Sequence, residues 1–127
     1  MSDVPSGLHY SDDHEYVRKD GDLYVIGVTD YAQGELGDVV FVELPSVGDS
    51  FSKGDSFGTI EAVKAVSDLF APVSAEVVEV NGTLDDDPSL VNAEPYGAGW
   101  MIKVRISDES ELSGLMDADA YKAHIGA

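Results

Sequence analysis

The chain of 127 residues contains no cysteine. Disulfides, thiolate metal sites and a cysteine nucleophile are therefore excluded, and any thiol chemistry must come from a cofactor. The three histidines (His9, His14 and His124) lack the spacing of zinc ligands. We do not expect His14 to act as the general base of a hydrolase, because no nucleophile or oxyanion motif accompanies it. The acidic run 85–87 lacks the ligand spacing of a calcium-binding loop.

Basic residues are scarce, since 7 Lys and Arg stand against 25 Asp and Glu, for a formal net charge of −18. Such a chain is a poor partner for nucleic acid or for an anionic membrane, which both need clustered positive charge. Basic surfaces of other proteins would instead attract it. So high an acidic content also suggests a salt-rich cytoplasm, and the fold should then loosen at low salt, where charge repulsion is unscreened.

Long apolar runs are also missing, because no segment approaches the length that a membrane-spanning helix needs. The start of the chain, residues 1–5, has neither the basic region of a secretory signal nor the Arg-rich pattern of an organelle leader. We therefore expect a cytoplasmic protein, with a mitochondrial location only if a leader has been removed.

Short β-type runs separated by turn residues predict a mainly β protein, a sandwich or barrel of antiparallel strands. The length fits one domain over residues 1–127, with a core over about 7–106 and a helical segment over about 107–125 that packs on it. The expected strands cover 15–18, 23–28, 39–44, 65–70, 75–80 and 100–106, with glycine-containing runs at 47–51 and 53–61. An expected helix over 31–36 is capped by Thr29-Asp30. Short amphipathic helices are expected over 109–116 and 118–125, with Asp117 capping the second, and a helical turn capped by Asp87 covers 89–91.

Lys64 is a lone cation in an apolar and acidic stretch, residues 60–68. On one continuous strand, alternation would place it on the same face as Ile60 and Val66, where an unpaired ammonium is costly. The conflict disappears if the chain reverses at 63–65, so that Lys64 lies at the tip of a hairpin in solvent. A lysine presented in this way can be modified and carry a long prosthetic group. Alternatively, it is an ordinary turn lysine of an unmodified acidic interaction domain.

Motifs along the chain resemble those of the H protein of the glycine cleavage system, from about residue 7 to about residue 124. In order, they are HE (14–15), GVTDYAQ (27–33), GDVVFVELP (37–45), EAVKAVSD (61–68), APVS (71–74), EVN (79–81), PYG (95–97) and GWMIK (99–103). Each fragment alone is weak evidence for the resemblance, but the whole set in this order is specific to the family. The resemblance implies a flattened barrel of two antiparallel sheets, the lipoyl- or biotinyl-carrier type of barrel-sandwich hybrid, with short helices.

The resemblance also implies that lipoic acid is attached through an amide to Lys64. The chain would then be a carrier without catalytic activity, and most simply a monomer. Its implied partners are a pyridoxal-phosphate glycine decarboxylase, a tetrahydrofolate-dependent aminomethyltransferase, a dihydrolipoamide dehydrogenase that uses FAD and NAD, and a lipoylating enzyme. An H-like protein that relays lipoyl groups to other lipoate-dependent complexes is the alternative. Biotin is disfavoured, because Lys64 does not lie between methionines.

Three acidic residues are candidates for secondary roles around the arm. Glu15, in the His-Glu motif, and Asp68, on the returning arm of the hairpin, would receive the ammonium of a loaded arm. Glu61, three residues before Lys64, would be a recognition contact for the lipoylating enzyme. In each case the alternative is a solvated acid in a very acidic protein.

Two positions depart from the family pattern. Tyr16 replaces the usual Trp after His-Glu, which keeps an aromatic ring and adds a hydroxyl that needs a partner. Ala75 replaces the usual Gly eleven residues after the lysine. It would be strained if the corner required a positive φ, so we expect a negative φ there.

Overall fold

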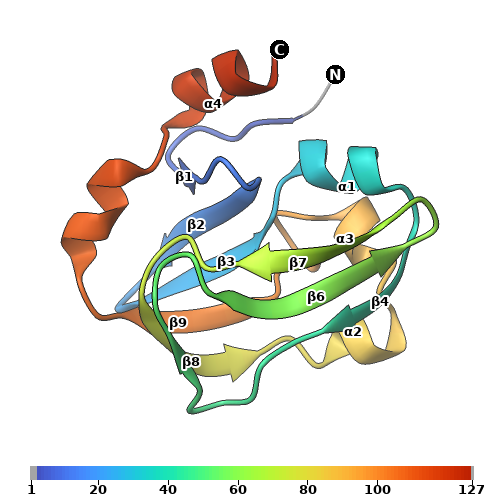
Figure 1. The fold of residues 1–127 in the computed structure, drawn as a ribbon, viewed down its shortest axis with the longest axis horizontal. Coiled ribbons are helices and arrows are strands. Elements are labelled where there is room, and N and C mark those ends of the chain that lie inside the picture. The colour runs from blue at the N-terminus through green and yellow to red at the C-terminus, as the bar shows by residue number, and fades with distance from the viewer. Residues whose placement is uncertain (1–2, 127) are drawn as a thin grey trace.

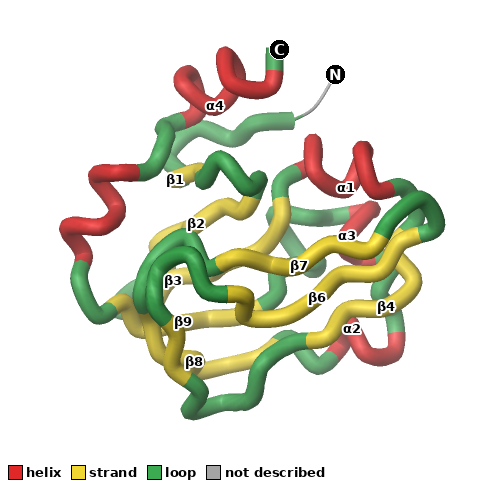
Figure 2. Tube along the Cα trace, in the orientation of Figure 1, coloured by secondary structure: helices red, strands yellow, loops and turns green. Residues whose placement is uncertain are grey.

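The computed structural model describes residues 3–126, which form two antiparallel sheets with short helices around them (Figures 1 and 2). The larger sheet has the strand order β1-β2-β3-β9-β8-β5 and the smaller sheet the order β4-β6-β7. The strands are β1 (His9–Tyr10), β2 (Glu15–Asp20), β3 (Leu23–Val28), β4 (Val39–Glu43), β5 (Ser50–Phe51), β6 (Ser56–Ala62), β7 (Val66–Phe70), β8 (Ala75–Val80) and β9 (Ile102–Ile106). The predicted mainly β fold with two antiparallel sheets is confirmed, although neither sheet closes on itself.

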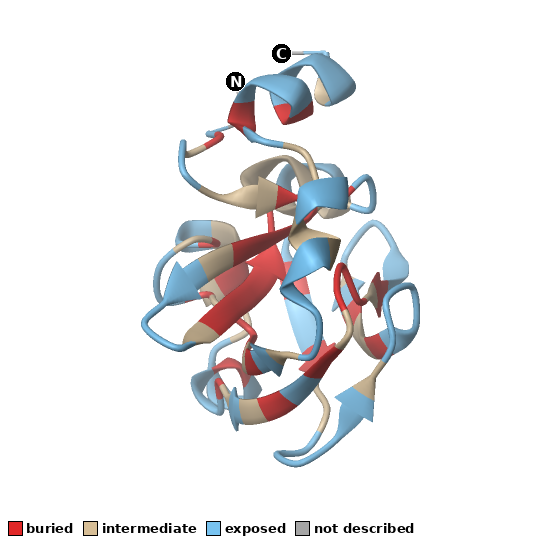
Figure 3. Ribbon diagram, turned by 90° about the vertical axis from the view of Figure 1, so that its left-hand side faces the viewer, coloured by how far each residue is buried: buried red, intermediate tan, exposed pale blue. Residues whose placement is uncertain are grey.

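The main core lies between the two sheets, where the strands present alternate apolar side chains to one another. Figure 3 shows these buried positions as interrupted bands along the strands. The largest fully buried aliphatic side chains of this core are Ile26, Ile60, Leu69, Leu84, Met101 and Ile102.

A second, smaller core lies where the C-terminal helix covers the N-terminal strands. Its buried members are Val4, Tyr10, Tyr16, Val25, Ala118 and Tyr121. The rings of Tyr10 and Tyr121 stack with their centroids 4.7 Å apart. The C-terminal segment therefore packs on the β core, as its apolar residues predicted.

The helices are α1 (Asp30–Leu36), α2 (Thr83–Asp86), α3 (Leu90–Ala93), the 3₁₀ helix η1 (Glu109–Gly114) and α4 (Ala118–Ile125). Thr29 and Asp117 cap α1 and α4, since their side chains accept the backbone N–H of the third residue on. Within residues 3–126, every helix is too short and too polar to span a membrane.

Two helix predictions were wrong in detail. The segment predicted as a short amphipathic helix over 109–116 is the shorter 3₁₀ helix η1, in which Ser113 Oγ donates to the Ser110 carbonyl at 2.7 Å. Serine side chains compete with the backbone for hydrogen bonds and so disfavour a regular α-helix. Asp87 does not cap the next helix, because α3 begins at Leu90 and the Asp87 N–H instead closes α2 on the Thr83 carbonyl.

Both departures from the family pattern are accommodated as predicted. The Tyr16 hydroxyl donates to the Pro95 carbonyl at 2.6 Å, and its ring occupies the space that a side chain at Gly27 would take. Ala75 lies in β8 and is unstrained, because His14 is the only non-glycine residue with a positive φ in the described chain.

Candidate functional site

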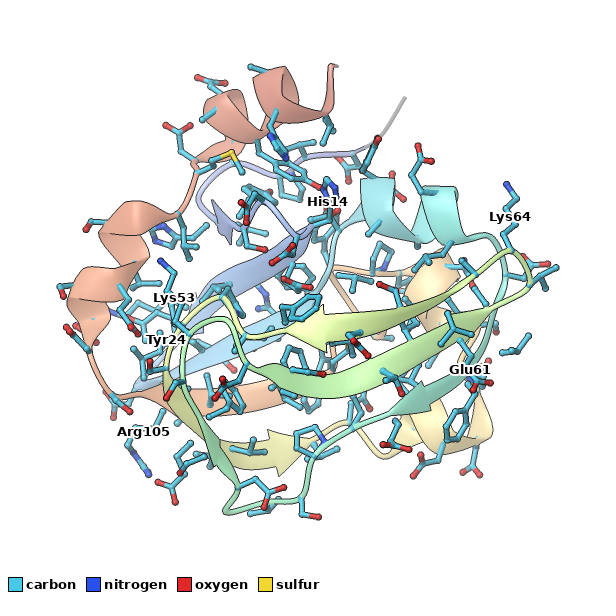
Figure 4. The ribbon with its side chains drawn as sticks, viewed as in Figure 1. His14, Tyr24, Lys53, Glu61, Lys64 and Arg105 are labelled. Carbon is cyan, nitrogen blue, oxygen red and sulfur yellow. The ribbon has the colours of Figure 1, made fainter. Side chains whose placement is uncertain are left out.

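The β6–β7 hairpin presents Lys64 at its tip. Glu61 pairs with Val66 at the end of the ladder, and the Ala62 N–H donates to the Ala65 carbonyl at 2.9 Å to close the turn. Lys64 is exposed and extends away from the body of the protein (Figure 4). Among residues 3–126, no ion pair includes this side chain. The predicted reversal at 63–65 and the exposure of Lys64 are both confirmed.

The backbone of the hairpin tip is held against the C-terminal end of α1. The Val63 N–H donates to the Asp38 carbonyl at 2.9 Å, and the Lys64 N–H donates to the Leu36 carbonyl at 3.3 Å. Gly37 has a φ of 82°, and a Cβ on it would lie 3.3 Å from Lys64 Cγ and 3.5 Å from Lys64 Cε. The stem of the lysine therefore lies over this glycine, so the root of the side chain is fixed while its amine reaches solvent.

Asn92, on α3, supports the turn on which Lys64 rests. Its amide nitrogen donates to Gln33 Oε1 and to the Gly37 carbonyl, both at 2.9 Å, and its oxygen accepts the Val39 N–H at 2.8 Å. These three hydrogen bonds tie α1 and the residues just after it to α3. The position of the lysine root therefore depends on a residue far along the chain from Lys64.

A cleft of about 230 Å³, which we call the α1 cleft, lies between α1 and β7 beside the hairpin. Its apolar lining includes Val28, Ile60 and Leu69, and the acidic residues along it are Asp13, Glu15, Glu35 and Asp68. The structure thus places the predicted Glu15 and Asp68 in one cleft and adds Asp13 and Glu35, which the sequence did not single out. A cleft with an apolar lining and several carboxyl groups suits a ligand with an aliphatic body and a cationic end.

Glu61 does not line this cleft. It lies on the outer face of the smaller sheet, exposed, in a cross-strand row with Phe41 on β4 and Val66 on β7. Asp68 pairs with Thr59, two positions from Glu61 on β6, so strand alternation directs its carboxylate to this same outer face, although the residue also borders the α1 cleft. Of the three acids singled out from the sequence, only Glu15 is buried beside the cleft.

Glu15 is buried, with 2% of its surface exposed. Ser11 Oγ donates to its Oε1 at 2.8 Å, and the Phe70 N–H donates to its Oε2 at 3.4 Å. Burial outweighs both hydrogen bonds and raises the pKa of Glu15 to about 8. At neutral pH the side chain is therefore mostly a neutral carboxylic acid. Residues 14 and 15 alone gave no sign of this burial, which depends on β7 and on the 11–14 turn.

His14 forms part of the same cleft near the other end of α1 (Figure 4). Its backbone has a φ of 69°, and its Nδ1 lies 2.8 Å from the Tyr121 hydroxyl, which is also 2.7 Å from Thr29 Oγ1. Burial, and then the nearby His124, lowers the pKa of His14, so the ring is neutral at pH 7. One hydroxyl from α4 thus links His14, which lines the α1 cleft, to Thr29, the residue that caps α1.

A larger cleft, of about 540 Å³, lies between the C-terminal segment and the β core. Lys53 is one of its lining residues and is far along the molecule from Lys64 in Figure 4. The smaller cleft is instead lined by Leu36, whose carbonyl accepts the Lys64 N–H, and by Ser67 on β7, three residues after the lysine. The smaller cleft is therefore the one that a group attached to Lys64 would meet first.

Comparison with known proteins places the chain among carriers of one kind. The family model described as "Glycine cleavage H-protein" matches residues 8–126. The glycine cleavage system H proteins of Staphylococcus haemolyticus and Carboxydothermus hydrogenoformans are each 57% identical, covering 97% and 96% of this chain and 98% and 94% of their own. The crystal structure of the Mycobacterium marinum H protein superposes with a TM-score of 0.90 at 39% identity, covering 98% of this chain and all of that one.

Proposed function

Because the chain belongs to the glycine cleavage H-protein family, which implies a lipoate carrier, we propose that Lys64 is the residue that carries the lipoyl group, through an amide at Nζ. The observation that supports this most strongly is the exposed amine at the tip of a hairpin whose backbone is held against α1. A fixed root and a free amine suit a group that must be modified once and then swing between partners. Lys64 also falls at the lysine of the EAVKAVSD motif.

The chain functions as the lipoyl-bearing shuttle of the glycine cleavage system. In our proposal it takes an aminomethyl group from a pyridoxal-phosphate glycine decarboxylase and delivers it to a tetrahydrofolate-dependent aminomethyltransferase. A dihydrolipoamide dehydrogenase, with FAD and NAD, then restores the disulfide. The sulfur chemistry is supplied by the lipoyl dithiolane, and the chain itself catalyses none of these steps. A monomer serves best for a carrier that must meet several enzymes in turn. The bacterial relatives support a cytoplasmic location.

The α1 cleft is the place where this chain would shelter a loaded arm. Val28, Ile60 and Leu69 would contact its aliphatic part and exclude water from the bond between carbon and sulfur. Glu15 and Asp68 would accept hydrogen bonds from its ammonium end. A nearby cation favours the ionised form of a carboxyl group, so a docked ammonium would lower the raised pKa of Glu15 and favour release of its proton to solvent.

Exchange of labelled bicarbonate into glycine by glycine decarboxylase tests the proposal, because the exchange needs a lipoylated carrier. The wild-type chain, after lipoylation with a lipoate–protein ligase, should support exchange. Lys64→Arg, which keeps the charge but cannot form the amide, should support none. Lys53→Arg is the matched control and should behave as wild type. Exchange at the wild-type rate with Lys64→Arg would rule out the assignment.

A further inference from the structure

Exposed apolar side chains gather around the hairpin that bears Lys64. Val40, Phe41, Val63 and Val66 are 55%, 45%, 73% and 67% exposed, and we call them the hairpin patch. In the described chain the only other large apolar residue of comparable exposure is Val47, in the β4–β5 loop. A cluster of this kind on a protein with a net charge of −18 is unusual and marks a contact surface.

Strand pairing brings these residues together. Phe41 pairs with Glu61, and Glu61 pairs with Val66, so the three form one row across the outer face of the smaller sheet. Val63 is bonded through its backbone N–H to Asp38, two residues before Val40. The hairpin patch is therefore one surface at the root of Lys64, assembled from segments more than twenty residues apart in sequence.

A β-bulge creates much of the patch. The register shifts between Val39 and Phe41, so the adjacent residues Val40 and Phe41 are both exposed while Val39 and Val42 are both buried. Regular alternation would direct one of the two adjacent side chains inward. The bulge thus keeps an additional large apolar side chain in solvent beside the lysine, which costs stability and calls for a partner that covers it.

The location of the reacting atom distinguishes the lipoylating enzyme from the other partners. Enzymes that act on the dithiolane can reach it at the far end of a long arm. The lipoylating enzyme must instead bring its catalytic groups to Lys64 Nζ itself, and therefore has to cover the hairpin and its immediate neighbours. The acids at the edges of the patch, Asp38 and Glu43, and Glu61 within it, require positive charge on whatever covers this face.

We propose that the hairpin patch is the docking surface for the lipoylating enzyme, whose complementary face is an apolar groove bordered by Arg or Lys side chains. This proposal rests on lipoyl attachment at Lys64. In the reaction the Lys64 ammonium loses a proton and the amine displaces AMP from a lipoyl adenylate. The C–N bond forms, the C–O bond to AMP breaks, and the second proton is released. Docking on the patch would hold Nζ at the acyl carbon during this exchange.

Lipoylation kinetics test the proposal directly. The unmodified chain is incubated with a purified lipoate–protein ligase, lipoate and ATP, and the modified fraction is followed by intact mass. The double variant Phe41→Ser/Val66→Ser should raise the KM for the carrier about tenfold or more while changing kcat little, since truncated central contacts weaken docking. Glu61→Lys should weaken it as well. Val47→Ser, equally apolar and exposed but away from the hairpin, is the matched control and should match wild type.

The same variants, fully lipoylated by long incubation, separate this proposal from its alternatives. Their bicarbonate exchange with glycine decarboxylase should remain within about twofold of wild type. Unchanged lipoylation with a loss of exchange would assign the patch to the decarboxylase and overturn the proposal, as would a Val47→Ser effect equal to that of the double variant. If wild type itself acquires no lipoyl group on Lys64, the attachment site fails instead, which is a distinct result. Urea unfolding of each variant confirms that the fold is intact.

Discussion

Replacing Glu15 by Gln should change how the stability of the fold depends on pH. Glu15 is buried and its pKa is raised from 4.5 to about 8. Below pH 4.5 the side chain is protonated in both the folded and the unfolded chain. Between pH 4.5 and 8 only the unfolded chain ionises, so the contribution of Glu15 to stability falls as the pH rises through this window. Gln cannot ionise and removes that dependence.

The size of the effect follows from the shift in pKa. Each unit of pKa difference corresponds to about 1.4 kcal/mol, so wild type should lose roughly 2–3 kcal/mol of stability relative to Glu15→Gln between pH 5 and pH 7. The amide also places a donor opposite Ser11 Oγ or the Phe70 N–H. The loss of one hydrogen-bond acceptor lowers the stability of Glu15→Gln by on the order of 1 kcal/mol at every pH. The variant is therefore expected to be near or below wild type in stability at pH 5 and above it at pH 7.

Urea denaturation at a constant, high ionic strength measures this difference at several pH values, and the other titrating groups largely cancel between the two proteins. Glu43→Gln, an exposed acid on β4, is the control for losing one unit of negative charge. Parallel stability curves for wild type and Glu15→Gln from pH 5 to pH 8 would show that Glu15 is ionised in the folded chain. The account of the α1 cleft given above would then be wrong.

Three further outcomes are expected. Gly37→Ala should destabilise the fold by about 1–2 kcal/mol in urea titrations, because φ is 82° and the new Cβ meets the Lys64 stem. Amide exchange should speed up at Val63 and Lys64, and unchanged exchange there would contradict the support that α1 gives to the hairpin. Tyr121→Phe should lower the free energy of unfolding by about 1–3 kcal/mol, because His14 and Thr29 lose the hydroxyl that joins them. Full wild-type stability would contradict that link. Raising NaCl from about 0.1 M to about 1 M shortens the Debye length from about 10 Å to about 3 Å, so the Tm should rise for a chain of net charge −18. A Tm that is independent of salt would show that repulsion among the acidic residues does not limit the stability of the fold.

Local signals in the sequence predicted much of this architecture. The conflict between a strand face and a cation located the turn at Lys64, and side-chain caps at Thr29 and Asp117 located the starts of α1 and α4. Each of these signals involves residues close together in the chain. The structure agrees with them because nothing distant overrides the local preference.

Features that depend on distant segments could not be predicted in the same way. The burial of Glu15 requires β7, and the link from Tyr121 to Thr29 joins residues 92 positions apart. The bulge in β4 is defined only by its pairing with β6. The β-branched run 39–44 alone therefore could not predict that Val40 and Phe41 are both exposed. Periodicity reports which face a residue occupies in a regular element, but not where the register shifts.

Peptide mapping by tandem mass spectrometry, on the chain after incubation with lipoate, ATP and a lipoate–protein ligase, tests the central claim most directly. The account predicts one lipoyl group per chain, on Lys64, and none on the Lys64→Arg variant. A lipoyl group on any other lysine, or an unmodified Lys64 in a folded chain exposed to a competent ligase, would contradict it.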